Sequence, residues 1–141
     1  MRVERLSPAE VRPLRQAVLR PHQRAEELAW PGDDDPRALH VGVRGESGEL
    51  IGVASVVPVS GPHGDWRVRG MAVDPAARGA GVGAAMVDAL LDHVRAQGGT
   101  RAWCDARVNV AAFYERAGFA RVGEEFDKGP IGMHVPMARD V

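Results

Sequence analysis

The chain has little cysteine, little lysine and no long apolar run. Only one of its 141 residues is cysteine, Cys104, so no disulfide can form within the chain. Its longest nearly apolar run, residues 50–59, is too short to cross a bilayer, and residues 1–20 carry charges throughout, unlike a signal peptide. The formal net charge of −1 provides no basic field for nucleic acid or an anionic membrane. We therefore expect a cytoplasmic protein without nucleic-acid or membrane partners.

The length is suited to one domain, residues 1–141, that buries its own core without metal or disulfide. Helices are predicted to begin at Ser7-Pro8, with Pro13 kinking or shortening the first one, to follow residue 81, and to cover residues 109–117. Apolar runs and turn signals predict strands at residues 3–6, 39–43, 50–57, 66–73, 100–106, 120–126 and 131–137. This order predicts an α/β (α+β) fold with helices on both faces of a mixed sheet, whose three middle strands are antiparallel. The long second helix would cross over to a parallel neighbour.

The most informative segment lies between the fourth predicted strand and that long helix. After the apolar residues 71–73 and the turn Asp74-Pro75, the chain reads Arg78-Gly79-Ala80-Gly81-Val82-Gly83. Glycines at every second position leave backbone N–H groups uncovered, and a helix N-terminus adds unpaired donors and a positive dipole end. These features predict a seat for a phosphate or pyrophosphate.

Two common phosphate-binding motifs do not match this segment. The glycine spacing is G-x-G-x-G rather than the dinucleotide fingerprint G-x-G-x-x-G, and no lysine follows it as in a P-loop. A flexible loop in a chain with 17 glycines is the plain alternative. The helix that follows the loop argues against this alternative. Its apolar stripe ends before Gly98-Gly99 and consists of Val82, Met86, Leu90 and Val94.

Two motifs resemble the GCN5-related N-acetyltransferase (GNAT) family. Residues 71–91, MAVDPAARGAGVGAAMVDALL, resemble the family's acyl-CoA loop R/Q-x-x-G-x-G/A, with Arg78, Gly81 and Gly83 in the motif positions. Residues 109–119, NVAAFYERAGF, resemble its second cofactor segment, and residues 122–137 resemble a branch of small members ending in G-E-x-F…H-x-x-M. The resemblance covers nearly the whole chain. It implies a mixed, mostly antiparallel sheet of six to seven strands.

The resemblance also implies transfer of an acetyl group from acetyl-CoA to a primary amine by direct attack in a ternary complex, without a metal. The fourth strand would carry a bulge and splay from the strand that holds Cys104, so that acetyl-CoA lies in the cleft between them. Three groups of residues would bind it: Arg78, Gly79, Ala80, Gly81, Val82, Gly83 and Ala84 around the pyrophosphate; Met71, Ala72 and Val73 along the pantetheine; and Asn109, Ala112 and Phe113 on the other side of the cleft. Asn109 is expected to cap its helix as well.

Tyr114 is the predicted general acid, because a tyrosine can protonate the departing thiolate. The general base is open, since the strand WRVRGMAV lacks a carboxylate. The candidates are His134, Asp105, Glu125, His63 and water. Cys104 is interpreted as a small buried residue rather than a nucleophile.

The acceptor is not identified by the sequence; small amines, amino acids, peptide N-termini and protein lysines all stay open. The acidic run Asp33-Asp34-Asp35 is either an attractant for a cationic amine or, the interpretation we favour, a solvated turn. Trp30 and Trp66 are candidates to line an acceptor pocket, although core packing is favoured for Trp66, and Glu26 and Glu27 lie in the same region as Trp30. A catalytically silent acyl-CoA-binding module and a regulatory acetyltransferase of a macromolecule are the alternative functions, and a homodimer is open.

Overall fold

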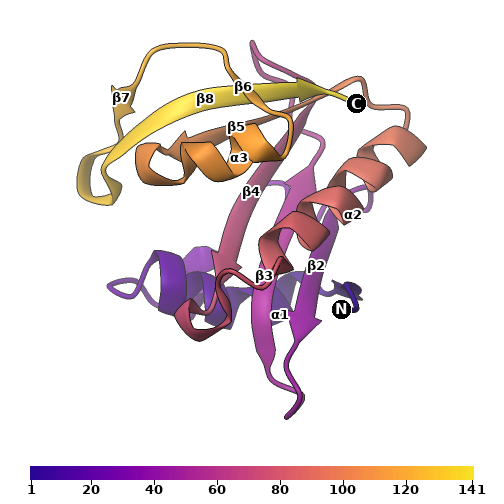
Figure 1. Ribbon diagram of the computed structural model, residues 1–141, viewed down its shortest axis with the longest axis vertical. Helices are drawn as coiled ribbons and strands as arrows, with labels where there is room; N and C mark the ends of the chain where they lie inside the picture. Colours follow the sequence, from indigo (N-terminus) through magenta and orange to yellow (C-terminus); the bar gives the residue numbers. More distant parts are fainter.

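A computed structural model describes all residues, 1–141, and places the eight strands in one sheet (Figure 1). The strand order is β1-β2-β3-β4-β5-β8-β6, and β7 also pairs with β8. The strands are β1 Glu4–Leu6, β2 Leu39–Arg44, β3 Leu50–Val57, β4 Trp66–Val73, β5 Arg101–Arg107, β6 Ala120–Arg121, β7 Phe126–Asp127 and β8 Met133–Asp140. The α-helices are α1 Pro8–Leu14, α2 Val82–Ala96 and α3 Ala111–Arg116. None of the helices is both long and apolar enough to cross a membrane.

The sheet is mixed and mostly antiparallel, as predicted. Strands β1 to β4 are antiparallel neighbours, β4 and β5 are parallel across the α2 crossover, and β5 is antiparallel to β8. The sequence predicted one strand at 120–126, where the structure has the two short strands β6 and β7, so the strand count is eight. Pro136 explains this break. Its carbonyl accepts a hydrogen bond from the Val122 N–H, but proline has no N–H to donate to the Val122 carbonyl, so the ladder stops there.

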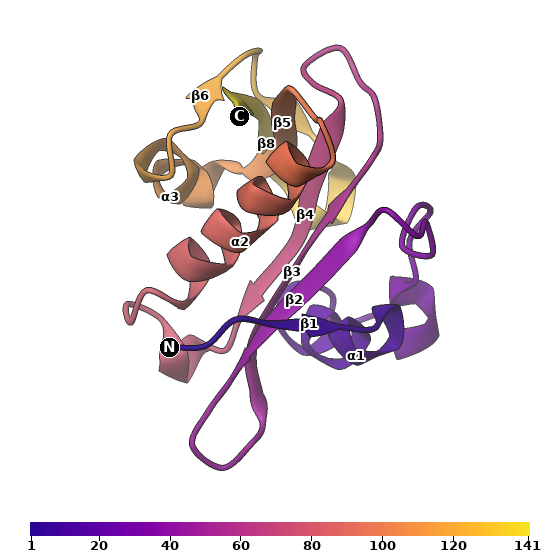
Figure 2. The same ribbon diagram turned by 90° about the vertical axis from the view of Figure 1, so that its right-hand side faces the viewer.

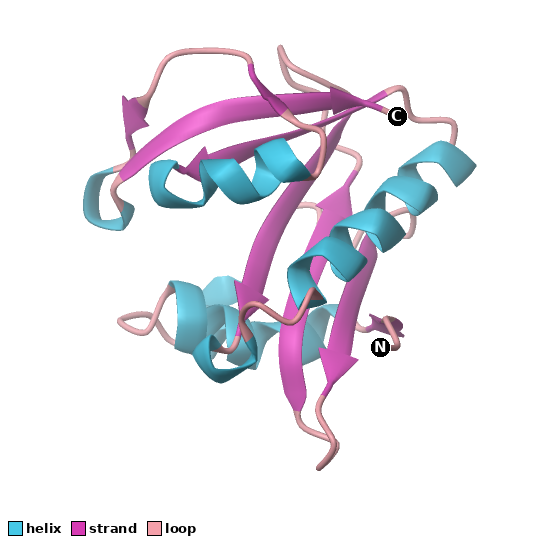
Figure 3. Cartoon of the chain, in the orientation of Figure 1, coloured by secondary structure: helices cyan, strands magenta, loops and turns pink.

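The helices cover the two faces of the sheet separately (Figures 2 and 3). Helix α2 contacts β2, β3 and β4, and its predicted apolar stripe is buried in the main core together with Trp66. Helix α1 packs on β2 and β3 from the opposite side, and it begins with a capping box formed by Ser7 and Glu10. We call these sides the α2 face and the α1 face.

The first helix changes its geometry after Pro13, as expected for a proline inside a helix. Helix α1 ends at Leu14 and continues as a wider π-helical turn, η1, over Arg15–Leu19, followed by the 3₁₀ turn η2 at Ala25–Leu28. Because η1 contacts β4, it brings Arg15 and Leu19 to the centre of the α1 face.

Strand β4 contains a bulge that reverses which residues face which side. Its register against β3 shifts between the Val53–Ala72 and Ser55–Arg69 pairs, so β4 carries one extra residue there. Gly70 lies in the bulge with φ +67°, and a Cβ atom at this position would be only 2.9 Å from Nε of Arg15. Before the bulge, Trp66 and Val68 belong to the core under α2; after it, Met71 packs there, whereas Ala72 belongs to the apolar cluster on the α1 face.

Strands β4 and β5 separate soon after they pair. Only Trp66 with Ala102 and Arg67 with Trp103 are matched, and beyond them the two strands have no common ladder. The edge of β4 from Val68 onward therefore has no strand partner on this side, and an opening forms between the strands. Both the bulge and the splay were expected from the family resemblance.

Candidate active site

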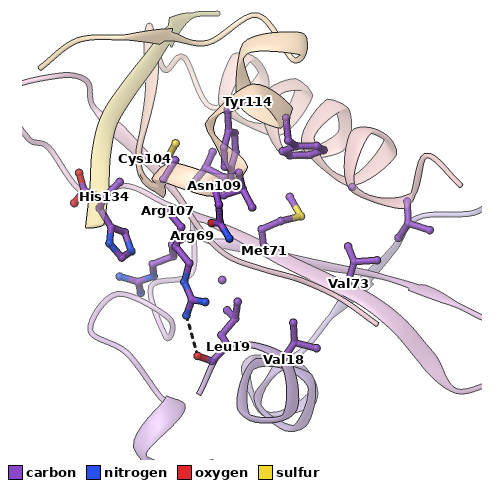
Figure 4. A pocket seen from close by; sticks show the side chains of 18 of the residues that line it. Val18, Leu19, Arg69, Met71, Val73, Cys104, Arg107, Asn109, Tyr114 and His134 are labelled. Carbon is purple, nitrogen blue, oxygen red and sulfur yellow. Dashed lines mark hydrogen bonds between the residues drawn. The ribbon is translucent and has the colours of Figure 1, made fainter. Parts of the chain in front are cut away.

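A cavity of about 920 Å³ occupies the opening between β4 and β5 (Figure 4). Most of the site residues predicted from the sequence line it, although they come from four separate parts of the chain: Met71, Val73, Arg78, Gly79, Gly81, Val82, Gly83, Ala84, Asp105, Asn109, Phe113, Tyr114 and His134. The fold therefore brings the glycine loop, β5, α3 and β8 together around one space.

Three predicted residues do not line this cavity, nor do two of the base candidates. The side chain of Ala72 lies in the cluster on the α1 face because the bulge reverses its direction. Ala80 and Ala112 are exposed outside the cavity. His63 lies in the turn before β4, and Glu125 is exposed beside Arg121, so neither can reach an acceptor in the cavity.

The glycine loop presents a row of unpaired donors. Gly81 is the N-cap of α2 with φ +83°, a conformation that L side chains rarely adopt. The first backbone bond of this helix runs from the Ala85 N–H to the Gly81 carbonyl, so the N–H groups from Gly79 to Ala84 donate to no protein acceptor. With Arg78 exposed beside them, these donors suit a pyrophosphate.

Asn109 does not cap α3, contrary to the prediction. It lies in the 3₁₀ turn Val108–Val110, the N-cap of α3 is Val110, and no side chain caps the helix. The extra turn separates Asn109 from the N2 and N3 amides that a cap would need. Its side chain forms no hydrogen bond within the protein and lines the cavity (Figure 4).

Tyr114 is buried between two aromatic rings of its own segment. Its ring makes edge contacts with Phe113 and Phe119 at centroid distances of 5.1 and 5.5 Å, and its hydroxyl bonds to no protein group. Burial raises the pKa of Tyr114 far above its ordinary value, and the neighbouring Cys104 adds to this. Tyr114 is therefore protonated throughout the physiological range.

Cys104 lines the cavity as a neutral thiol. The side chain is buried on β5, and burial raises its pKa to about 12. A thiol of that pKa has almost no thiolate at neutral pH, which argues against an acyl-cysteine route.

His134 and Asp105 are the base candidates that the fold places at the cavity. Nδ1 of His134 lies 2.9 Å from the Gly132 carbonyl, which can only accept, so Nδ1 carries the proton and Nε2 keeps its lone pair. Burial lowers the pKa of His134 and so favours this neutral form. The Asp105 carboxylate instead lies between Arg67 at 3.5 Å and Lys128 at 3.7 Å.

The interpretation of Asp33 as part of a solvated turn, or as an attractant for a cation, is wrong. Asp33 is buried and accepts hydrogen bonds from Arg15 at 2.7 Å and Arg69 at 3.0 Å. Burial alone would raise its pKa, but the hydrogen bonds and charge of Arg15 hold the pKa below its ordinary value. Asp34 is exposed, and Asp35 pairs with Arg37. Three adjacent aspartates thus have three different environments, and the amino-acid sequence of this run did not distinguish between them.

The other acceptor-side residues considered from the sequence divide similarly. Trp30 lines the cavity, and the guanidinium of Arg15 lies 4.0 Å from its ring centroid. Glu26 and Glu27 are exposed beside Arg24 and lie outside the cavity.

The sequence did not predict six basic side chains that line the cavity: Arg20, Arg67, Arg69, Arg107, Arg116 and Lys128. The strand WRVRG carried one signal, because arginines that alternate with apolar residues place two cations on one face of a strand. The others come from distant segments and had no common pattern.

Known proteins resemble this chain in sequence and in fold. The acetyltransferase (GNAT) family profile matches residues 4–119. An uncharacterized N-acetyltransferase of Bacillus subtilis (strain 168), YitI, is 33% identical over 142 residues, covering 97% of this chain and 94% of that protein. An aminoglycoside 6'-N-acetyltransferase complexed with coenzyme A has a TM-score of 0.79 at 17% identity, covering 99% of this chain and 97% of that one. A spermidine N-acetyltransferase SpeG chimera has a TM-score of 0.72 at 17% identity, covering 99% and 96%.

The cavity, its unpaired N–H donors and these similarities agree. The opening between β4 and β5 and the donors before α2 suit the pantetheine and pyrophosphate of coenzyme A, the ligand of one structural relative. The chain is therefore an N-acetyltransferase that uses acetyl-CoA and belongs to the acetyltransferase (GNAT) family.

Proposed function

We propose that residues 1–141 form one catalytic domain that acetylates a primary amine by direct attack in a ternary complex. The observation that carries this proposal is that the cavity reaches both faces of the sheet through the opening between β4 and β5. The glycine loop and α3 line the cavity on the α2 face, and Asp105 and His134 line it on the α1 face. Donor and acceptor can thus meet within one space without a covalent enzyme intermediate.

The backbone would bind most of the donor. Acetyl-CoA supplies an acetyl group activated as a thioester. The N–H groups from Gly79 to Ala84 would hold its pyrophosphate, with Arg78 alongside. The unpaired edge of β4 beyond Arg67 would hold the pantetheine arm, and its N–H groups near the bulge would polarise the acyl carbonyl.

Tyr114 and His134 would handle the two protons of the reaction. The Tyr114 hydroxyl, protonated and without a protein partner, would donate to the thiolate sulfur as coenzyme A leaves. The lone pair on Nε2 of His134 would accept the proton from the attacking amine, directly or through water. Positioning in the narrow opening would provide much of the rate.

The test is the Tyr114→Phe variant, which removes only the hydroxyl. We expect kcat to fall about 10²- to 10⁴-fold, the range of general acid catalysis, with acetyl-CoA binding unchanged. Thiol release measures turnover. Binding is measured as the rise in Tm, which corresponds to about 2.7 kcal/mol at 100 times Kd.

Three results would count against the proposal in distinguishable ways. If Tyr114→Phe retains full turnover, Tyr114 is not the acid. If the wild-type protein binds acetyl-CoA but no tested amine releases thiol, a silent acyl-CoA-binding module is the better description. If acetyl-CoA leaves Tm unchanged, the cavity does not bind the donor.

A further inference from the structure

The cavity has a strong excess of positive charge where it meets the α1 face. Five cationic side chains line this part: Arg20, Arg67, Arg69, Arg107 and Lys128. Asp105 is the only carboxylate that lines the cavity. The whole chain has a net charge of −1, so this excess is a local property of the site.

Strand alternation places three of these cations, Arg67, Arg69 and Arg107, on the face opposite the glycine loop. On β4, Trp66 and Val68 pack under α2, so Arg67 and Arg69 point to the other face. On β5, Cys104 and Ala106 pack in the same core, so Asp105 and Arg107 also point to the α1 face. Figure 4 shows Arg69 and Arg107 beside Leu19 of η1, away from Val73. This cationic group is thus separate from the predicted pyrophosphate seat.

Two of the five cations have no carboxylate partner. Arg67 and Lys128 share Asp105, and Arg69 pairs with the buried Asp33. Arg107 and Arg20 each donate to the Leu19 carbonyl, at 3.0 Å in both cases. A neutral carbonyl leaves both guanidinium charges uncompensated and most of their N–H donors free.

Like charges this close together raise the free energy of the site unless an anion binds between them. Burial lowers the pKa values of Arg20 and Lys128, and the neighbouring arginines add to this, although Asp105 opposes the shift at Lys128. Guanidinium groups bind carboxylate and phosphoryl oxygens with paired, charge-assisted hydrogen bonds. A positive surrounding also disfavours the ammonium form of a bound amine, which leaves the free amine that can attack.

We propose that the acceptor is a small amine that also carries an anionic group, a carboxylate or a phosphoryl group, which Arg107 and Arg20 bind on the α1 face. This inference rests on the proposed acetyl transfer. It disfavours polycationic acceptors such as spermidine, because the excess positive charge of this part of the cavity would repel them.

The experiment compares matched amines as acceptors. The pairs are β-alanine against β-alaninamide, and 2-aminoethyl phosphate against ethanolamine, with spermidine as the polycation. We expect the anionic member of at least one pair to have roughly ten- to a hundredfold higher kcat/KM, the effect of a charge-assisted hydrogen bond. The pair with the larger ratio identifies the anion.

The Arg107→Gln variant tests where the anion binds. We expect it to raise the KM of the anionic amine about tenfold or more, while the neutral amine and the Kd of acetyl-CoA change little. Arg107→Lys should restore part of the preference. Arg95→Gln is the matched control, because Arg95 is on α2 and pairs with Asp92 outside the cavity. If Arg107→Gln does not fold, Arg20→Gln makes the same test.

Calorimetry on protein saturated with coenzyme A separates the inference from the enzymatic proposal. Binding of β-alanine or 2-aminoethyl phosphate that Arg107→Gln weakens supports the inference even where no amine is turned over. If the neutral amine is used equally well or better in both pairs, or if spermidine is used as well as the anionic amines, the inference is overturned and acetyl transfer still stands. It is also overturned if both arginine variants keep the preference for the anionic amine, or if no anionic amine binds at all.

Discussion

The two faces of the sheet use different chemistry at the same cavity. On the α2 face the proposed recognition groups are backbone N–H donors, from Gly79 to Ala84, and they lie within one short segment of the chain. On the α1 face they are charged side chains, and Arg20, Arg69, Arg107 and Lys128 come from four distant segments. Backbone N–H groups suit the part of coenzyme A that is the same in every acyl-CoA. Side chains can be replaced without altering the fold, so they suit recognition of a particular acceptor.

The same difference extends to the layer beneath each face. Under α2 the core is apolar, with Met86, Leu90 and Val94 fully buried. Under the α1 face lies a buried polar network, in which Asp33 joins Arg15 and Arg69 while Ser55 joins Arg15 and His40. We expect substitutions and pH to affect these two regions very differently.

The largest expected effect comes from Asp33→Asn. This change leaves Arg15, which is fully buried, without its counter-charge. Breaking a buried pair from one side costs about 3–5 kcal/mol of unfolding free energy. Urea unfolding measures this loss. Asp34→Asn is the control, because that neighbouring aspartate is exposed and its loss should change stability by less than about 0.5 kcal/mol. Equal effects of the two variants would contradict the role of the buried pair.

An intermediate effect is expected from Gly81→Ala at the α2 N-cap. A non-glycine residue at φ +83° is strained by roughly 1–2 kcal/mol, and relaxation of the loop would displace its N–H groups. We expect about tenfold weaker acetyl-CoA binding by calorimetry, since 1.4 kcal/mol corresponds to a factor of ten.

Gly48→Ala is the matched control for the loop. Gly48 also has a positive φ, +88°, and open space around it, but it lies in the β2–β3 turn outside the cavity. It should lose similar stability and keep full acetyl-CoA affinity. If both variants bind acetyl-CoA normally, the loop is not the pyrophosphate seat.

The smallest expected effect is a pH dependence of stability that originates under the α1 face. Burial lowers the pKa of His40, and Arg15 and Arg69 oppose its protonation more weakly, although Asp33 favours it. The unfolded state therefore binds a proton first, and the unfolding free energy should fall as pH drops below about 6.5, the ordinary histidine pKa. The loss should level off below the folded-state pKa.

Thermal unfolding between pH 7.5 and 5.5 measures this dependence. His40→Gln should reduce the slope, whereas His22→Gln, at an exposed position, should keep it. His134, whose pKa burial also lowers, contributes to the remaining slope. An unchanged slope in His40→Gln would mean that His40 does not control this region.

Features that depend on nearby residues were predictable from the sequence. The α2 helix, the strands at 50–57 and 66–73, and the glycine loop all appear where local periodicity and turn residues placed them. The exceptions had specific physical causes. Pro136 on β8 interrupts the pairing of 120–126, and an additional 3₁₀ turn removes Asn109 from the cap of α3.

The sequence by itself determined the family, the fold class and acetyl-CoA as the donor, because the proposed donor site is a contiguous run of backbone groups with a recognisable spacing. Only the tertiary structure decided the acceptor side. There, a single extra residue in β4 reverses the direction of Ala72, and folding buries Asp33 while it gathers basic side chains from distant segments. The charge of a site depends on which residues lie near one another in the folded protein, not on the net charge of the chain. The cationic cavity of a chain with net charge −1 could therefore be found only from the tertiary structure.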